Sequence, residues 1–289
     1  MTLPSTPIRW PAETIWQTVS PHLPGFTVEV LPAIDSSNTE LLRRFKSGRP
    51  EPTLLVAEHQ TAGRGRLGRH WQSTRADSLT FSLGLSLQPA DWSGLSLAVG
   101  ISLADSLDPA RAAPQHIGLK WPNDLWLCSA EGERKLGGIL VETASWEGQR
   151  FVVIGVGINI HAVALARAPA VGAGDAFRPV PSSVPPAALD ALLPGIDAPQ
   201  ALLQVVAPLV RAVQAFEHFG FTPFQARFAR RDVLSGRAVQ VFDGAASVEG
   251  SAHGVAENGA LRVHTAAGMK EITSSEVSVR PAAKGPRAC

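Results

Sequence analysis

Apolar residues recur at helical spacing in several parts of the chain. The first part opens with Ser37 in the position of a helix cap and has Glu40 three positions later, which is the pattern of a capping box. The same spacing recurs over residues 93–107 and 202–219. The Thr-Pro-Phe-Gln sequence that starts at residue 222 is typical of a helix start, and the helix is expected to end near Leu234. The pattern therefore predicts four main helices.

Between these helices, other apolar runs predict strands. Residues 79–87 alternate apolar with small polar side chains, as in a strand with one buried face. Residues 151–160 are apolar almost throughout, which is typical of a central strand that is buried on both faces. Shorter apolar runs add expected strands at residues 54–57, 117–121 and 136–142.

The segment after residue 235 has a different pattern. Short alternating runs are separated by Asp243-Gly244 and Asn258-Gly259, and these pairs are typical of hairpin turns. We therefore expect a small β-barrel domain over residues 236–289. Its expected strands comprise residues 239–242, 248–255, 261–263 and 270–272.

Two segments lack such patterning. Residues 1–33 are rich in proline and predict a short lead-in that is too short, and too poor in helical periodicity, to form a helix-turn-helix domain. Residues 161–200 are dominated by Ala, Pro, Gly and Val. They predict an irregular insertion with one short helix near residues 187–193.

The charge balance of the chain argues against a general affinity for nucleic acid. Its 26 Lys and Arg residues nearly equal its 25 Asp and Glu residues, so any site for an anion must come from a local cluster. No apolar run is long enough to span a membrane. The two cysteines, Cys128 and Cys289, are isolated in the sequence, which favours a reducing compartment and a cytoplasmic protein.

One local cluster of basic residues lies in the loop from Gln60 to Trp71. Three glycines and three arginines alternate there in the sequence Gly-Arg-Gly-Arg-Leu-Gly-Arg. Glycine backbone approaches a ligand closely and arginine binds phosphate or carboxylate oxygens, so the loop is suited to close over an anion. The Gly-x-Gly-x-x-Gly spacing does not indicate a dinucleotide fold, because neither a helix nor a suitably spaced acid follows. Without other signals, a solvated loop remains the alternative.

Three further motifs combine glycine or rigid turns with polar residues. Lys-Trp-Pro-Asn-Asp covers residues 120–124, Lys-Leu-Gly-Gly-Ile-Leu-Val-Glu covers 135–142, and Gly-Val-Gly-Ile-Asn covers 155–159. Aspartate is a ligand for Mg²⁺, and glycine inside a strand often marks a ligand against the backbone. Taken singly, the first motif is better explained as an ordinary Asx turn, and tight sheet packing explains each of the other two equally well.

The motifs in this order, preceded by Asp-Ser-Ser-Asn at residues 35–38, closely resemble those of the biotin–protein ligases. The resemblance is strong over residues 30–160 and continues through 224–239 and the C-terminal segment, but it does not include 161–200. It implies an α+β fold, with a catalytic domain related to class II aminoacyl-tRNA synthetases and lipoate ligases over residues 1–235. An SH3-like barrel follows over residues 236–289.

The resemblance also implies an activity. Members of the family use ATP and Mg²⁺ to convert biotin to biotinyl-adenylate. They then transfer biotin to a lysine of the biotin carboxyl carrier domain of acetyl-CoA carboxylase. No protein nucleophile is needed, no zinc site is expected because the eight histidines show no ligand spacing with the cysteines, and no NAD is expected. The chain is expected to be a monomer or a homodimer without specific DNA or membrane partners.

Site residues follow by motif from the same resemblance. Arg64, Arg66 and Lys135 are expected to act in catalysis, and Asp124 to hold magnesium. Arg66, Asn123 and Asn159 are expected to bind the nucleotide. Ser37 stands where the family usually has threonine, which retains the hydroxyl and loses a methyl group. The expected biotin-binding residues are Ser36, Ser37, Asn38, Gln60, Gly63, Arg64, Gly65, Arg66, Trp71, Lys135 and Gly138.

Three alternatives remain beside this interpretation. A lipoate or octanoate ligase would share the fold, but it would lack the Gly-Arg-Gly-Arg loop combined with Lys-Trp-Pro-Asn-Asp. A biotin-sensing transcriptional regulator is disfavoured because the biotin motif begins at Ser36 and no helix-turn-helix is expected. A nucleic-acid module that uses the arginine-rich loop is disfavoured by the near-neutral charge.

Overall fold

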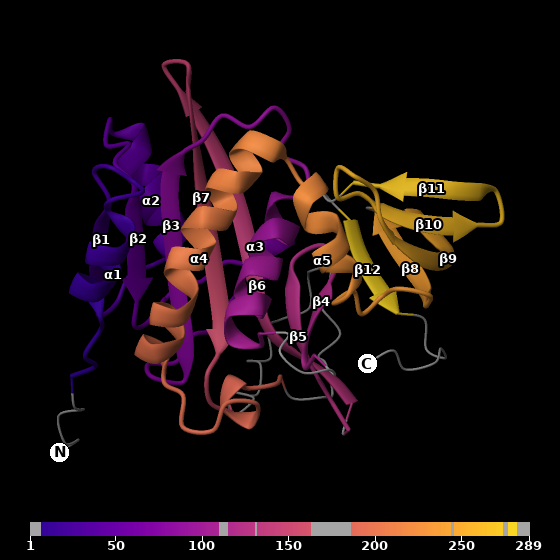
Figure 1. The fold of residues 1–289 in the computed structure, drawn as a ribbon, viewed down its shortest axis with the longest axis horizontal. Helices are drawn as coiled ribbons and strands as arrows, with labels where there is room; N and C mark the ends of the chain where they lie inside the picture. Colours follow the sequence, from indigo (N-terminus) through magenta and orange to yellow (C-terminus); the bar gives the residue numbers. More distant parts are fainter. Residues whose placement is uncertain are drawn as a thin grey trace, which may run out of the picture.

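The computed structural model describes residues 7–109, 115–130, 132–162, 186–243, 246–273 and 277–281, which form two sheets with helices (Figure 1). The large sheet has the strand order β1-β2-β3-β7-β6-β5-β4. It consists of β1 (Thr27–Leu31), β2 (Thr53–Ala57), β3 (Ser78–Ser86), β4 (Ile117–Lys120), β5 (Asp124–Ser129), β6 (Gly132–Trp146) and β7 (Gln149–Asn159). As predicted, β7 lies at the centre of this sheet.

Helices cover the two faces of the large sheet unequally. Figure 1 shows α3 and α4 crossing one face, where α1 also packs against α4, whereas α2 contacts the strands from the other face. The α-helices are α1 (Ala12–Val19), α2 (Ser37–Lys46), α3 (Leu95–Leu107), α4 (Ala198–Phe219) and α5 (Gln225–Ala229). Short 3₁₀ turns are η1 (Arg66–Gly68), η2 (Leu189–Ala191) and η3 (Thr222–Phe224).

The alternation along β3 explains this division. Leu79, Phe81 and Leu83 are fully buried in the main core beneath α3 and α4, whereas Ser82 and Gly84 point toward the α2 face. A smaller core cluster fills the space beneath α2: Leu41, Phe45, Leu55, Phe151 and Val153. The α2 face therefore carries large apolar residues at one end and small residues at the other.

The prediction that residues 1–33 form only a lead-in was wrong. Residues 12–19 form α1, whose Ile15 and Val19 are buried, and residues 27–31 form β1, which pairs in parallel with β2. The helix has only two turns, and prolines flank it, so its narrow apolar stripe gave little periodicity.

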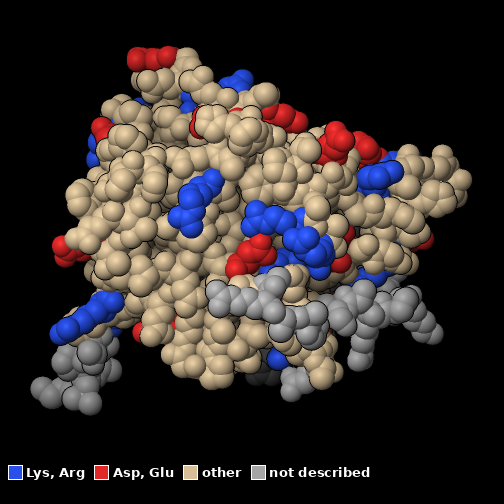
Figure 2. All heavy atoms as spheres, in the orientation of Figure 1, with Lys and Arg blue, Asp and Glu red and all other residues tan. Residues whose placement is uncertain are grey.

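An additional strand and the end of one helix also differ from the prediction. Residues 124–129 form β5, which was not predicted and which joins β4 to β6. The helix expected from residue 222 ends at Ala229 because the buried Arg231 that follows bonds Asp105 and Asp108 outside the helix. Near the middle of the face that Figure 2 shows, basic side chains gather beside acidic ones.

The C-terminal segment forms a second, antiparallel sheet with the order β11-β10-β9-β8-β12. The four predicted strands are confirmed, and β12 is an additional strand. Gly259 has a φ of 80°, as the predicted Asn-Gly turn requires, whereas Gly244 of the other expected turn lies outside the described residues. The strands are β8 (Ala238–Asp243), β9 (Ala246–Val255), β10 (Leu261–Thr265), β11 (Gly268–Ile272) and β12 (Val277–Pro281).

Most of the predicted insertion, residues 163–185, lies outside the described residues. The short helix expected near residues 187–193 is the 3₁₀ turn η2, and Asp197 caps α4 with Gln200 in a capping box. No helix among the described residues is long and apolar enough to cross a membrane. Cys128 on β5 is disulfide-bonded, contrary to the expectation of unpaired cysteines, and Cys289 lies outside the described residues.

Candidate active site

Small residues on the α2 face of the sheet leave room for other side chains. Ser82 of β3 lies directly opposite Gly155 of β7. A Cβ atom on residue 155 would stand 2.2 Å from Asn38 Oδ1, and one on residue 157 would stand 2.4 Å from the Trp71 ring. Gly155 and Gly157 of the Gly-Val-Gly-Ile-Asn motif therefore leave the space that Asn38 and Trp71 occupy.

Helix α2 begins beside this surface, one residue earlier than its predicted cap. Ser36 has an extended backbone, and its hydroxyl accepts a hydrogen bond from the Thr39 N–H at 3.4 Å. Ser37 is therefore the first helical residue, and the prediction of a cap at Ser37 was wrong by one position. The change leaves the Ser37 hydroxyl available to the interior of the site.

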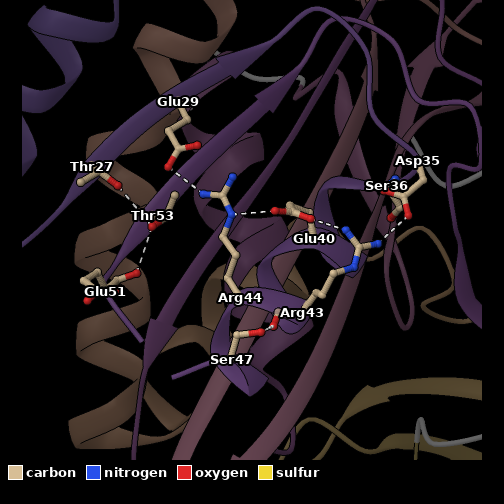
Figure 3. Close-up of polar contacts among 10 residues, drawn as sticks. All are labelled: Thr27, Glu29, Asp35, Ser36, Glu40, Arg43, Arg44, Ser47, Glu51 and Thr53. Carbon is tan, nitrogen blue, oxygen red and sulfur yellow. Dashed lines mark hydrogen bonds and ion pairs between the residues drawn. The ribbon is translucent and has the colours of Figure 1, made fainter. Parts of the chain in front are cut away.

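Ion pairs hold the outer side of α2, and Glu40 belongs to them rather than to a capping box (Figure 3). Arg43 bonds both Glu40 and Asp35, and Arg44 bonds Glu40 and Glu29 at 2.8 and 2.7 Å. The Ser36 N–H, with a further contribution from Arg43, lowers the pKa of Asp35. These contacts fix the turn that leads into the helix.

Four buried polar side chains form a continuous chain along the floor of the site. The Ser37 N–H and hydroxyl donate to Gln60 Oε1 at 2.7 and 3.0 Å. The Ser82 hydroxyl lies 2.7 Å from Ser37 Oγ and 2.6 Å from Asn38 Oδ1. None of the four is more than 6% exposed. Such a chain satisfies its own members and offers polar groups to a ligand.

The arginine-rich loop folds back on itself beside this floor. The Trp71 N–H donates to the Gly63 carbonyl at 2.9 Å, and the Gly65 N–H donates to the Arg69 carbonyl at 2.7 Å. Gly68 has a φ of 68° at the tip, which glycine adopts without steric cost. The Trp71 indole N–H lies 3.4 Å from Thr80 Oγ1. Trp71 thus anchors the loop to β3 and β7.

Arg64 reaches from this loop to the sheet and to α2. Its guanidinium donates to Glu142 Oε1 at 2.8 Å and to Thr39 Oγ1 at 3.2 Å. Glu142 lies on β6 at the end of the Lys-Leu-Gly-Gly-Ile-Leu-Val-Glu motif. The sequence had indicated Arg64 as a ligand-binding residue but had given Glu142 no role.

Basic side chains lie at the end of the cavity away from the polar floor, which is called the cationic end. Lys135 Nζ lies 2.7 Å from Asp124 Oδ1, and burial lowers the pKa of Arg66, an effect that Asp124 opposes. The cavity has about 990 Å³ of empty space, part of it open to solvent. Among its described lining residues, Asp124 is the single carboxylate, and the cations are Arg64, Arg66, Arg69, Lys120 and Lys135.

The Lys-Trp-Pro-Asn-Asp turn joins this cationic end to the C-terminal sheet. Asn123 Nδ2 donates to the Ile139 carbonyl at 2.8 Å, and the Ile139 N–H donates back to the Asn123 carbonyl at 2.9 Å. Trp121 is buried, and its indole N–H donates to the Gly259 carbonyl at 3.0 Å. The turn between β9 and β10 thus helps to fix the position of Asp124.

Two predicted site residues do not line the cavity. Asn159 is 7% exposed, and its Nδ2 donates to the Ala187 carbonyl at 3.0 Å, so it holds the segment before η2 against β7. Gly63 packs against the backbone of Trp71 at the other end of the loop, since a Cβ atom on residue 63 would stand 2.3 Å from the Trp71 carbonyl oxygen. The predicted residues that do line it are Ser36, Ser37, Asn38, Gln60, Arg64, Gly65, Arg66, Trp71, Asn123, Asp124, Lys135 and Gly138.

Sequence reasoning gave no role to several residues that complete the site. The alternation of residues 79–87 contained a signal for Thr80 and Ser82, because small polar residues recur there on one strand face. That pattern predicted a strand but not a binding surface. The other lining residues without a predicted role include Arg69, His70, Lys120, Leu140, Gly155 and Gly157.

This arrangement suits a small molecule with a polar ring at one end and an anionic end. The buried chain from Gln60 to Asn38 offers hydrogen bonds, whereas the excess of cations stabilises carboxylate and phosphate oxygens. Because five cations line one cavity, their charge can offset the repulsion between two anions that are brought together there.

Comparisons with known proteins agree with this geometry. Residues 30–159 match the biotin/lipoate A/B protein ligase family, and residues 234–280 match the biotin protein ligase C-terminal domain. The bifunctional ligase/repressor BirA of Escherichia coli is 34% identical over 272 residues, which cover 91% of this chain and 77% of that protein. The chain belongs to the biotin–protein ligase family. A Paracoccus denitrificans biotin–[acetyl-CoA-carboxylase] ligase is 30% identical, with 86% of this chain and 98% of that protein covered.

A solved member of the family has the same fold. The biotin protein ligase from Aquifex aeolicus, in complex with biotin and ATP, superposes with a TM-score of 0.68 and 27% identity. The match covers 88% of this chain and 99% of that one. The biotin–protein ligase fold, with a catalytic part followed by a small antiparallel sheet, is therefore common to both proteins.

Proposed function

We propose that this chain is an ATP-dependent biotin–protein ligase. It forms biotinyl-5'-AMP from biotin and ATP, then transfers biotin to a lysine of the biotin carboxyl carrier protein of acetyl-CoA carboxylase. The observation that carries the proposal is one cavity whose described lining residues comprise five cations, a single carboxylate and a buried polar floor. The ligase names of the relatives support it.

Charge explains the first step. The biotin carboxylate must attack the α-phosphorus of ATP, so two anions must approach each other before pyrophosphate leaves. Lys135, Arg64 and Arg66 reduce this repulsion and stabilise the charge that builds up in the transition state. The resulting mixed anhydride is labile, and the loop from Gln60 to Trp71 shields it from water.

The second step needs no protein nucleophile. The neutral amine of the acceptor lysine attacks the acyl carbon of the adenylate, the new amide bond forms, and AMP leaves with the electrons of the acyl–oxygen bond. Ser36, Ser37, Asn38 and Gln60 hold the biotin ring while this occurs. The Trp71 ring forms a wall of the pocket, and Gly65 and Gly138 leave room for the ligand. Asn123 and Arg66 order the nucleotide.

A magnesium ion fits the residues at the cationic end. Mg²⁺ in nucleotide sites usually takes one or two carboxylates and completes its coordination with phosphates and water. Asp124 is the carboxylate at hand, and it would hold the ion. The ion would neutralise phosphate charge when bound. Asn159 contributes to the nucleotide end indirectly, through the Ala187 segment that it holds.

The polar floor favours biotin over lipoate as substrate. A ureido ring can add hydrogen bonds to Ser37, Asn38 and Gln60, whereas a dithiolane ring offers no N–H or carbonyl group to this polar floor. Competition between labelled biotin and labelled lipoate for the protein tests this choice.

Other expectations belong to the same proposal. The catalytic domain comprises residues 1–235 and is related to class II aminoacyl-tRNA synthetases, and residues 236–289 form an SH3-like barrel. Dependence on ATP favours the cytoplasm. The near-neutral charge favours no specific DNA complex and no membrane partner, which a gel-shift assay checks for DNA. Both a monomer and a homodimer are compatible with the activity.

A transfer assay tests the proposal directly. The protein is incubated with ATP, Mg²⁺, biotin and a purified carrier domain, and the carrier is weighed by mass spectrometry. A mass gain of one biotin that depends on ATP and on Lys135 would support the ligase function. Absence of biotin binding, with binding of lipoate instead, would overturn it.

A further inference from the structure

Glu142 is the common partner of two site residues although it does not line the cavity itself. Its Oε1 accepts from the Arg64 guanidinium at 2.8 Å, and its Oε2 accepts from Asn38 Nδ2 at 2.9 Å. Arg64 belongs to the loop and Asn38 to α2, so one carboxylate on β6 joins three elements around the pocket.

The contact with Asn38 fixes the direction of hydrogen bonding along the floor. A carboxylate only accepts hydrogen bonds, so Asn38 must present its NH₂ group to Glu142. The same NH₂ group donates to the Leu140 carbonyl at 3.2 Å. The Asn38 oxygen therefore faces Ser82, whose hydroxyl lies 2.6 Å away. Without an acceptor at residue 142, only the weaker contact with the Leu140 carbonyl holds the Asn38 amide in this orientation.

The contact with Arg64 fixes the position of the loop. The Arg64 side chain is 47% exposed, whereas that of Glu142 is 21% exposed. A half-exposed ion pair contributes little to folding stability, typically about 0–1 kcal/mol. Its effect therefore lies in where the loop sits over the pocket rather than in holding the fold together.

We propose that Glu142 is a positioning residue for biotin binding, which acts through Asn38 and Arg64 without touching the ligand. This inference rests on the proposed function, because it concerns the same pocket. A glutamine at residue 142 keeps the size of the side chain and removes the charge that binds Arg64. It also replaces a carboxylate that only accepts with an amide, so the restraint on Asn38 is weaker.

The experiment is a double-mutant cycle on the full chain with Glu142→Gln, Arg64→Gln and the combined variant. Isothermal titration gives the biotin Kd, steady-state assays give kcat and the KM for ATP, and thermal unfolding gives Tm. The control is Glu13→Gln, which changes an exposed glutamate on α1, a helix packed on the other face of the sheet.

We expect Glu142→Gln to raise the biotin Kd about fivefold, with the KM for ATP and Tm nearly unchanged. The losses of affinity should be less than additive in the combined variant, because both changes break the contact between residues 64 and 142 whereas only Glu142→Gln disturbs Asn38. A biotin Kd within about twofold of wild type, or fully additive losses in the cycle, would overturn the inference. Wild-type protein that does not bind biotin would instead overturn the proposed function, and the inference with it.

Discussion

The Trp71 indole lies on the backbone of Gly157, so closely that a Cβ atom on residue 157 would stand 2.4 Å from the ring. Gly157 is on the central strand β7, whereas Trp71 ends the arginine-rich loop. The relationship explains why two motifs that lie far apart in the sequence occur together: the glycine provides the surface on which the tryptophan anchors the loop.

Gly157→Ala should therefore displace Trp71 and weaken biotin binding. The added methyl group cannot be accommodated by the indole at 2.4 Å, so the ring must move and the loop with it. We expect the biotin Kd to rise about tenfold, which corresponds to about 1.4 kcal/mol. Titration calorimetry on the purified variant measures the change.

A second substitution tests whether the clash is the cause. Trp71→Ala removes the ring that the new methyl group meets, so combining it with Gly157→Ala should cause no further loss of affinity beyond that of Trp71→Ala. If the two changes add fully instead, the contact between residues 71 and 157 does not explain the effect.

Arg66→Gly should retain some adenylate formation but release the intermediate. Arg66 begins the turn η1 at the tip of the loop and lines the cavity, so its loss opens the cover over the mixed anhydride. Chromatography of the reaction mixture without carrier measures free biotinyl-adenylate. Arg49→Gly, a change at an exposed residue after α2, is the control, and undiminished retention in Arg66→Gly would contradict the role of the loop as a cover.

The extent to which sequence predicted this structure differs between its parts. The unbroken apolar run of residues 151–160 predicted the central strand, because only a strand buried on both faces tolerates such a composition. The cap of α2 was placed one residue late, because Ser36 and Ser37 both satisfy the cap preference and only the backbone conformation distinguishes them.

The candidate site was predictable only where a residue belongs to a recognisable motif. Ser82 completes the polar floor but stands in an ordinary alternating strand, so its role depends on the register of β3 with β7. Asn159 stands in a motif, yet its amide bonds the Ala187 carbonyl rather than facing the cavity. Motifs indicate a neighbourhood, whereas the tertiary register decides which side chains enter it.

Lys135→Gln should reduce kcat for adenylate formation about 100-fold, which is typical for the loss of one group that stabilises transition-state charge. The stability of the fold should change little, because the pair with Asp124 is partly solvated, with 43% of the Lys135 side chain exposed. Pyrophosphate release, followed in single-turnover experiments, measures the effect. Lys46→Gln at the end of α2 is the control, and an unchanged rate in Lys135→Gln would exclude this lysine from the chemistry.

Asp232 should make stability depend on pH. Its side chain is 7% exposed, Oδ1 accepts from the Leu234 N–H at 2.9 Å, and Oδ2 has no hydrogen-bond partner among the described residues. Burial raises the pKa of Asp232 from 3.8 to about 6. Between these values the folded state holds a proton that the unfolded state releases, so this group stabilises the fold fully only at low pH. Its contribution is lost as pH rises through the window.

Asp232→Asn removes this dependence because an amide stays neutral and still accepts the Leu234 N–H. The variant should have nearly the same free energy of unfolding as wild type near pH 4. Near pH 7 its free energy of unfolding should be higher by up to about 3 kcal/mol. Urea unfolding at several pH values measures the difference in free energy of unfolding between the variant and wild type. The titration of all other groups cancels in this difference. Asp91→Asn is the matched control, since exposed Asp91 also accepts an N–H two residues on. A difference that stays constant with pH would show that Asp232 is ionised alike in the folded and unfolded chain.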